Sequence, residues 1–154
     1  MVKPRWLAVV LSAMVPGQGG CARVSFDGNK PVKDWETLAV PSNTGQCVFH
    51  DGHVFGLTRS GKLTCIDWAT GERVWEQPGF GDKGSLMLAA GRLIVLTGKG
   101  DLVIAEAVPK GYQELRRAPK VVGETYTPPV LSHGRIYCRG YAGKLVCLDL
   151  NGRP

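Results

Sequence analysis

The cysteines are the residues of this 154-residue chain with the greatest capacity for chemistry. Four of them follow residue 22: Cys47, Cys65, Cys138 and Cys147. None of the four has the short C-x-x-C spacing from which structural zinc sites take their ligands. The sequence therefore predicts no metal-binding residue. The remaining roles for these thiols are disulfide formation or burial as small apolar side chains.

The histidines and serines lie on or beside predicted turns, where solvated side chains are expected. The histidines are His50, His53 and His133, and the serines closest to turns are Ser42, Ser60 and Ser132. None of these serines has the G-x-S-x-G sequence of a nucleophile elbow, and no acidic partner is evident. We therefore predict no catalytic residue.

A repeated pattern of glycines and apolar runs must position these side chains. Each copy has two glycines nine positions apart, namely Gly52 and Gly61, Gly91 and Gly100, and Gly134 and Gly143. A turn, an apolar run, a second turn and another apolar run make up each copy. The interval between copies, about 40 residues, is the length of a β-propeller blade.

The apolar runs predict β-strands joined by hairpins. They are rich in Val, Ile, Leu and aromatic residues, and the glycines suit turns that need a positive φ. We place two-residue turns at Ser60-Gly61, Lys99-Gly100 and Ala142-Gly143. With the last of these turns, Cys138 and Cys147 lie opposite each other on one face of adjacent strands. They are a candidate disulfide, and the alternative is two buried thiols.

The predicted fold is all-β: a partial β-propeller of about three four-stranded antiparallel blades. A short strand precedes each first glycine, and the third unit stops after its third strand at Asp149. The propeller segment covers residues 34–154, with blades at about 46–76, 85–117 and 129–150. We expect residues 34–38 to be an isolated strand that ends a preceding unit, and residues 23–33 to be a linker.

The stretch from Cys65 to Trp75 resembles the tryptophan-docking motif of pyrroloquinoline-quinone (PQQ) propellers, A-x-D-x-x-T-G-x-x-x-W. It matches at Asp67, Thr70, Gly71 and Trp75, with Cys65 in place of Ala. The chain resembles the C-terminal blades of PQQ-like repeat proteins, which include quinoprotein dehydrogenases and a propeller lipoprotein of outer-membrane β-barrel assembly. We expect Asp67 and Gly71 to shape a turn and Trp75 to pack on the neighbouring blade, so these are structural residues.

PQQ dehydrogenases use an adjacent-cysteine pair, a calcium site and a catalytic aspartate, and this chain has no adjacent cysteines and no suitable acidic cluster. We therefore predict no cofactor-binding residue, and a non-catalytic propeller segment that acts as a scaffold or protein-interaction module. The alternative is the C-terminal part of a PQQ-dependent, alcohol dehydrogenase-like oxidoreductase whose PQQ and calcium site lies in missing blades.

Three blades are fewer than a closed propeller needs, because closure is what protects the edges of the sheets. Three explanations remain open. The chain is a piece of a longer propeller, it completes a ring with copies of itself or with a partner protein, or it folds as an open arc.

Residues 1–22 have the pattern of a secretory signal peptide. Lys3 and Arg5 precede the apolar run 6–15, and small residues follow, with a predicted cleavage after Ala22. The alternatives are a non-native leader or a lipidated Cys21, although Gln18 stands where a lipobox normally has Leu. A genuine signal predicts a periplasmic, cell-envelope or secreted protein. Membrane association is expected only if Cys21 is lipidated.

The formal net charge is +6, and the cationic residues are scattered over turns and strand ends. Solubility explains this pattern best, and an anionic envelope surface or an acidic partner protein comes second. The chain has no cationic run and no array of exposed aromatic residues, so nucleic acid is not an expected partner.

Overall fold

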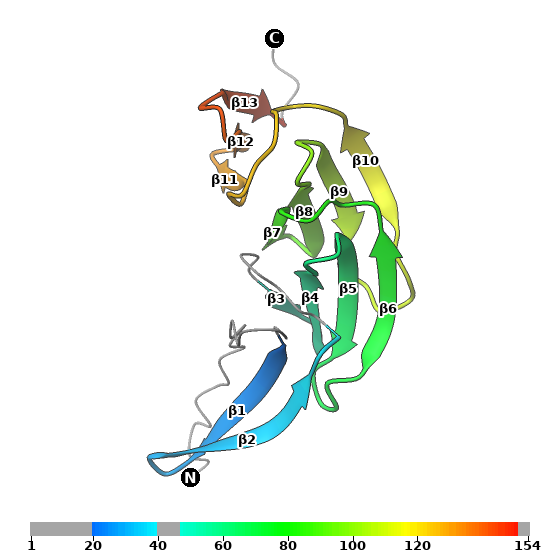
Figure 1. The fold of residues 1–154 in the computed structure, drawn as a ribbon, viewed down its shortest axis with the longest axis vertical. Helices are drawn as coiled ribbons and strands as arrows, with labels where there is room; N and C mark the ends of the chain where they lie inside the picture. The colour runs from blue at the N-terminus through cyan, green and yellow to red at the C-terminus, as the bar shows by residue number, and fades with distance from the viewer. Residues whose placement is uncertain (1–19, 40–46, 151–154) are drawn as a thin grey trace.

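The computed structural model describes residues 20–39 and 47–150, and within these two ranges the chain has thirteen β-strands and no helix. The strands form three antiparallel sheets and one separate hairpin. The sheets follow one another along an arc (Figure 1). The prediction of an all-β partial propeller is confirmed.

Each sheet is one propeller blade. Blade 1 contains β3 (Val48–His50), β4 (His53–Leu57), β5 (Lys62–Asp67) and β6 (Arg73–Pro78) in that spatial order. Blade 2 contains β7 (Ser85–Ala89), β8 (Arg92–Leu96), β9 (Leu102–Glu106) and β10 (Glu114–Ala118), and blade 3 contains β11 (Val130–Ser132), β12 (Arg135–Arg139) and β13 (Leu145–Asp149). The first strand of each blade lies on the concave side of the arc, and β6 and β10 lie on its convex side (Figure 1).

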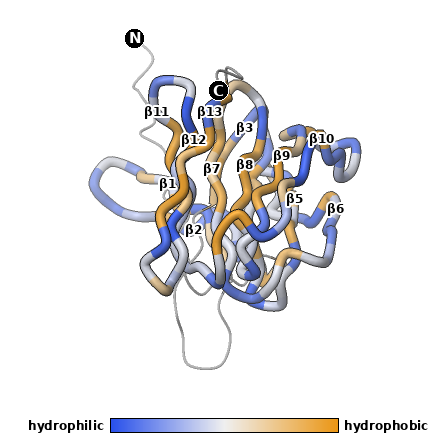
Figure 2. Tube along the Cα trace, turned by 90° about the horizontal axis from the view of Figure 1, so that it is seen from above, coloured by the Kyte–Doolittle hydropathy of each residue, from blue (hydrophilic) through white to orange (hydrophobic). Residues whose placement is uncertain are grey.

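Strands β7, β8 and β9 of blade 2 are largely buried on both faces of the sheet, which explains their nearly unbroken apolar sequences. Leu93 and Val95 pack with residues of blade 1, whereas Ile94 and Leu96 pack with residues of blade 3. Because side chains alternate along a strand, neighbouring residues of β8 belong to two different cores. Figure 2 shows hydrophobic colour along these central strands.

The first turn of each unit is a two-residue hairpin turn in which both residues have a positive φ. These pairs are Asp51 (45°) and Gly52 (74°), Ala90 (48°) and Gly91 (71°), and His133 (48°) and Gly134 (72°). Such turns match the twist of the strands that they join, so the glycines at these positions have a conformational role.

The second turn of each unit is one residue longer than we predicted. In blade 1, the Gly61 N–H donates to the Thr58 carbonyl (3.0 Å), and the Thr58 N–H donates to the Lys62 carbonyl (2.8 Å). Leu57 therefore pairs with Leu63. Thr58 and Lys62 close the turn, and residues 59–61 form the three-residue loop. The same pairing holds for blades 2 and 3. A type I turn followed by a glycine at positive φ produces this three-residue loop with its bulge.

This longer turn makes the predicted disulfide between Cys138 and Cys147 wrong. Cys138 pairs with Val146, and Cys147 pairs with Tyr137. A shift of one residue moves a side chain to the other face of the sheet. Accordingly, Cys138 is buried against blade 2 whereas Cys147 is exposed, and both are free thiols.

The expected linker at 23–33 is also wrong, because β1 (Cys21–Asp27) and β2 (Lys30–Thr37) form a hairpin there. Its turn is made by Gly28, at φ 62°, and Asn29. The strand expected at 34–38 is therefore paired and not isolated. The predicted signal peptide lies outside the described residues up to position 19, and its last two residues, Cys21 and Ala22, belong to β1.

Candidate interaction surface

The Asp67 carboxylate organises the turn between β5 and β6. Its Oδ1 accepts hydrogen bonds from the backbone N–H groups of Ala69 and Thr70, both at 2.8 Å, and from the Thr70 hydroxyl at 3.2 Å. The backbone hydrogen bond from Thr70 is the main reason why the pKa of Asp67 is lowered. Gly71, at φ 76°, completes the reversal into β6.

Trp75 joins blade 1 to blade 2. Its indole Nε1 donates to the Val108 carbonyl at 3.0 Å. Its ring lies 6.0 Å from that of Phe55 and 6.3 Å from that of Tyr112, measured between centroids. Of the four motif residues, Trp75 therefore makes the contact between blades, and Asp67, Thr70 and Gly71 shape the turn that precedes its strand.

A second docking tryptophan, Trp35 on β2, escaped the sequence analysis. Its Nε1 donates to the Trp68 carbonyl at 3.0 Å, and its ring covers Gly71. Asp27 stands eight positions before Trp35, as Asp67 stands eight positions before Trp75. The interval between the two tryptophans, about 40 residues, was the signal that could have found it. The motif is degenerate here, with Lys30 and Pro31 in place of its Thr and Gly.

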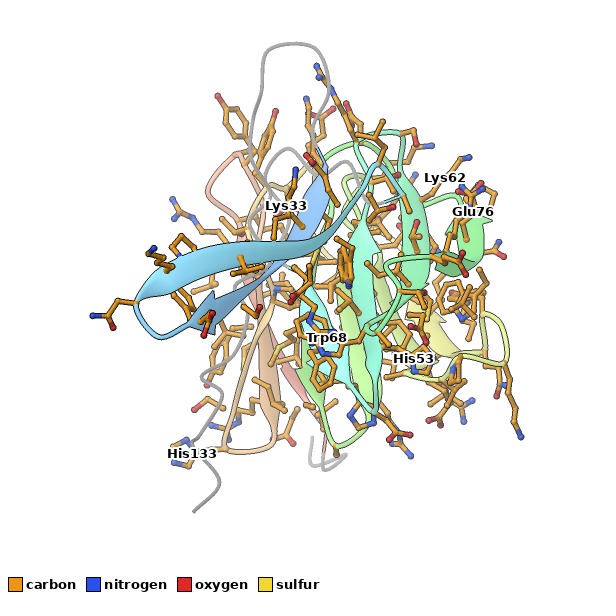
Figure 3. All side chains as sticks on the ribbon, turned by 90° about the horizontal axis from the view of Figure 1, so that it is seen from below. Lys33, His53, Lys62, Trp68, Glu76 and His133 are labelled. Carbon is orange, nitrogen blue, oxygen red and sulfur yellow. The ribbon has the colours of Figure 1, made fainter. Side chains whose placement is uncertain are left out.

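The β1–β2 hairpin thus corresponds to β5 and β6, the two outer strands of a blade. It lies against blade 1, where Arg23 stacks on the Trp68 ring at 4.8 Å. Within the hairpin, Arg23 also pairs with Asp34 at 3.1 Å. Figure 3 shows Trp68 beside this hairpin. These contacts continue the arc by part of a further blade.

One face of blade 3 is exposed, although the equivalent faces of blades 1 and 2 are buried. Leu63 of blade 1 is 0% exposed and Leu102 of blade 2 is 5% exposed, but the equivalent Leu145 is 67% exposed. Val130, also exposed, and Cys147 both pair with Tyr137, and Cys147 is two positions after Leu145, so these residues share one face of the sheet. We call Val130, Tyr137, Leu145 and Cys147 the open face of blade 3.

The turn beside the open face also lacks the cover that its counterparts have. At Gly61 and Gly100, an added Cβ would lie 2.8 Å from Gly81 and 2.1 Å from the Val122 carbonyl, because the connection to the next blade crosses the turn. The Phe80 N–H donates to the Gly61 carbonyl and the Val122 N–H donates to the Gly100 carbonyl. At Gly143, an added Cβ would meet no described atom within 4 Å.

A groove of about 450 Å³ adjoins this uncovered turn. Its lining residues are Thr125, Tyr126, Thr127, Arg139, Gly140 and Tyr141. The rings of Tyr126 and Tyr141 meet edge to face at 5.5 Å, and Tyr141 is 77% exposed. The Lys83 ammonium group lies 4.9 Å from the Tyr126 ring. Tyrosine and arginine are enriched at protein–protein interfaces, and the lining of this groove contains both.

The histidines remain on the turns where we predicted them. His50 and His53 are paired across the first turn of blade 1. His133 lies in the first turn of blade 3, far from His53 (Figure 3). Within residues 20–39 and 47–150, no group of three His, Cys, Asp or Glu side chains is placed to hold a metal ion. The same residues include no helix that could cross a membrane.

Antiparallel blades of up to four strands, stacked in sequence and joined by tryptophans that dock on the neighbouring blade, define a PQQ-like β-propeller protein. The sequence family described as "Outer membrane protein assembly factor BamB" matches residues 31–114. The chain belongs to this PQQ-like repeat family.

Two solved structures show the same fold. BamB from Moraxella catarrhalis matches with a TM-score of 0.67 and 17% identity over 88% of this chain and 44% of that protein. A europium-containing methanol dehydrogenase matches with a TM-score of 0.50 and 11% identity over 75% of this chain and 27% of the enzyme. The chain thus spans less than half the length of either protein. No curated protein sequence matches it.

Proposed function

We propose that this chain is a non-catalytic propeller segment that serves as a scaffold for protein assembly in the cell envelope. The observation that carries the proposal is the open face of blade 3, where Leu145 is 67% exposed although its two counterparts are buried. An apolar sheet face of this kind is covered by another polypeptide in a stable assembly. The covering element is a further blade of a longer propeller, another copy of the chain, or a partner protein.

The cell-envelope location rests on two observations. The matching family is described by a role in outer membrane protein assembly. Residues 1–22 have the composition of a secretory signal peptide. Both observations support a location outside the cytoplasm, and neither requires an enzyme activity.

The experiment is to measure the molar mass of the full chain by light scattering, alone and with proteins that co-purify from envelope extracts. We expect a discrete complex. Leu145→Arg should weaken it by roughly tenfold or more, because a charge would be buried in the apolar contact. Val74→Arg is the matched control, because Val74 is exposed on β6, outside the open face. A monomer that melts cooperatively and binds no partner would overturn the proposal.

The second candidate is part of a PQQ-dependent oxidoreductase, and the fold likeness to a methanol dehydrogenase is what favours it. Two observations support the first proposal instead: the sequence has no adjacent cysteines, and the described residues include no group of three His, Cys, Asp or Glu side chains that could hold a metal ion. Adding PQQ and calcium should therefore leave the melting temperature unchanged. A saturable rise would favour the oxidoreductase instead, since a ligand of the native state must stabilise it.

A further inference from the structure

Two cysteine side chains from separate elements meet beneath the β1–β2 hairpin. Cys21, the first residue of β1, is 1% exposed, and Cys47, just before β3, is half-buried. Both belong to the small core formed with Val54 and Ile66, which Trp35 also contacts. Cys47 packs against the cluster that contains Cys21, which places the two cysteine side chains in one small core.

The remaining cysteines have different surroundings. Cys65 and Cys138 are buried in the other two cores, and burial raises the pKa of the Cys65 thiol to about 12. Cys147 is exposed on the open face. The pKa of Cys21 is lowered, mainly because the hydrogen bond from Cys47 stabilises its thiolate. Since the thiolate is the reactive form, Cys21 is better suited to disulfide formation than the isolated buried thiols.

We propose that Cys21 and Cys47 form a disulfide that ties the β1–β2 hairpin to blade 1. Each thiol gives up its proton, and a bond forms between the two Sγ atoms. The two electrons and two protons pass to an incoming disulfide, small or protein-borne, which is reduced to two thiols. Both cysteines are free in the structure.

The position of the hairpin gives this bond a mechanical role. β1 and β2 form a sheet of their own and make no strand pairing with blade 1. Side-chain contacts, among them those of Trp35 and Arg23 with Trp68, hold the hairpin in place. A covalent link would limit the freedom of the unfolded chain between residues 21 and 47, and would keep the docking tryptophan on Gly71.

The proposal also bears on the fate of the N-terminal segment. A disulfide at Cys21 requires that this residue stay in the protein, which contradicts the cleavage after Ala22 predicted from the sequence. The same sulfur cannot carry a lipid. Persistence of the bond in cells rests on the proposed envelope location, because disulfides are stable in oxidising compartments.

The test is peptide mapping of the purified full chain after incubation with oxidised glutathione. Remaining thiols are blocked with iodoacetamide in denaturant, and the chain is cut with trypsin without reduction. We expect peptide 6–23 joined to peptide 34–59, lighter by two hydrogen atoms than their sum and separated by reductant. Cys147→Ser should keep this linked species, and Cys47→Ser should abolish it.

Thermal unfolding supplies a second readout. Oxidised wild-type protein should have a higher melting temperature than the same protein in reductant. The melting temperature of Cys47→Ser should be the same under oxidising and reducing conditions. If Cys47→Ser does not fold, peptide mapping of the wild-type protein still shows whether the Cys21–Cys47 disulfide forms. Blocked Cys21 and Cys47 with no linked peptide, or glutathione on either residue in place of the link, would overturn the proposal. Because the mapping needs no partner or assembly, a failed scaffold function would leave its result unaffected.

Discussion

The ring of Trp35 lies so close to Gly71 that a single added methyl group would collide with it. An ideal Cβ at Gly71 would come within 2.7 Å of the Trp35 ring, and Gly71 is also held at φ 76°. The glycine therefore has two requirements, a left-handed backbone and room for an aromatic ring from the preceding hairpin. This contact joins two segments of the chain that the sequence alone does not bring together.

Gly71→Ala should lower the free energy of unfolding by about 2–4 kcal/mol, of which about 1 kcal/mol is backbone strain and the rest displacement of the ring. Gly28→Ala is the matched control, because Gly28 has a similar φ of 62° and no atom within 4 Å of an added Cβ. Chemical denaturation of both variants is the measurement. Equal losses for the two would show that Trp35 does not occupy this position.

Trp75→Ala should destabilise the chain by about 3–5 kcal/mol, because it removes a large ring from the contact between blades 1 and 2. Trp75→Phe should lose about 1 kcal/mol, the usual net contribution of a hydrogen bond such as the one to the Val108 carbonyl. Val74 is the exposed sequence neighbour of Trp75, so Val74→Ala should change the free energy of unfolding by less than about 0.5 kcal/mol. A Trp75→Ala protein with wild-type stability in urea would contradict the docking role.

The contribution of Asp67 should depend on pH. Its folded-state pKa is lowered by hydrogen bonds from the backbone, so its stabilising effect is present above the unfolded pKa of about 4 and is lost as pH falls through the folded value. Asp67→Asn should thus be less stable than wild type near neutral pH, with a gap that narrows in acid. Urea titrations across this pH range would measure the gap.

Glu72→Gln is the control for that experiment, because it removes one negative charge from the same turn while the hydrogen bonds to Asp67 remain. A pH-independent gap for Asp67→Asn would mean that ionisation of Asp67 does not contribute to stability. An equal gap for Glu72→Gln would mean that the Asp67 carboxylate acts through net charge alone.

Equivalent leucines in different blades should respond very differently to truncation. Leu63→Ala should cost about 2–5 kcal/mol, because it leaves a cavity between blades 1 and 2. Leu145→Ala should cost less than about 0.5 kcal/mol where light scattering shows monomers, since Leu145 lies on the open face. A large loss for Leu145→Ala in the monomer would show that the described chain itself covers this face.

Much of the propeller could be predicted because its signals are local. Alternating apolar residues indicate strands, and the first glycine of each repeat, as Gly52, lies at the positive φ that its turn demands. The turn register was missed because a glycine at the end of a three-residue loop and one at the end of a two-residue loop have the same sequence pattern. That one-residue difference separated Cys138 from Cys147.

The sequence by itself determined the blade repeat, the turn glycines and the docking motif at Asp67, because each depends on residues close together in the chain. Only the tertiary structure decided which of the equivalent positions Leu63, Leu102 and Leu145 are buried, since burial depends on whether a neighbouring blade is present. The tertiary structure likewise decided that Trp35 covers Gly71 and that Cys21 and Cys47 share one core. Such contacts arise when separate elements stack, and no local pattern records them.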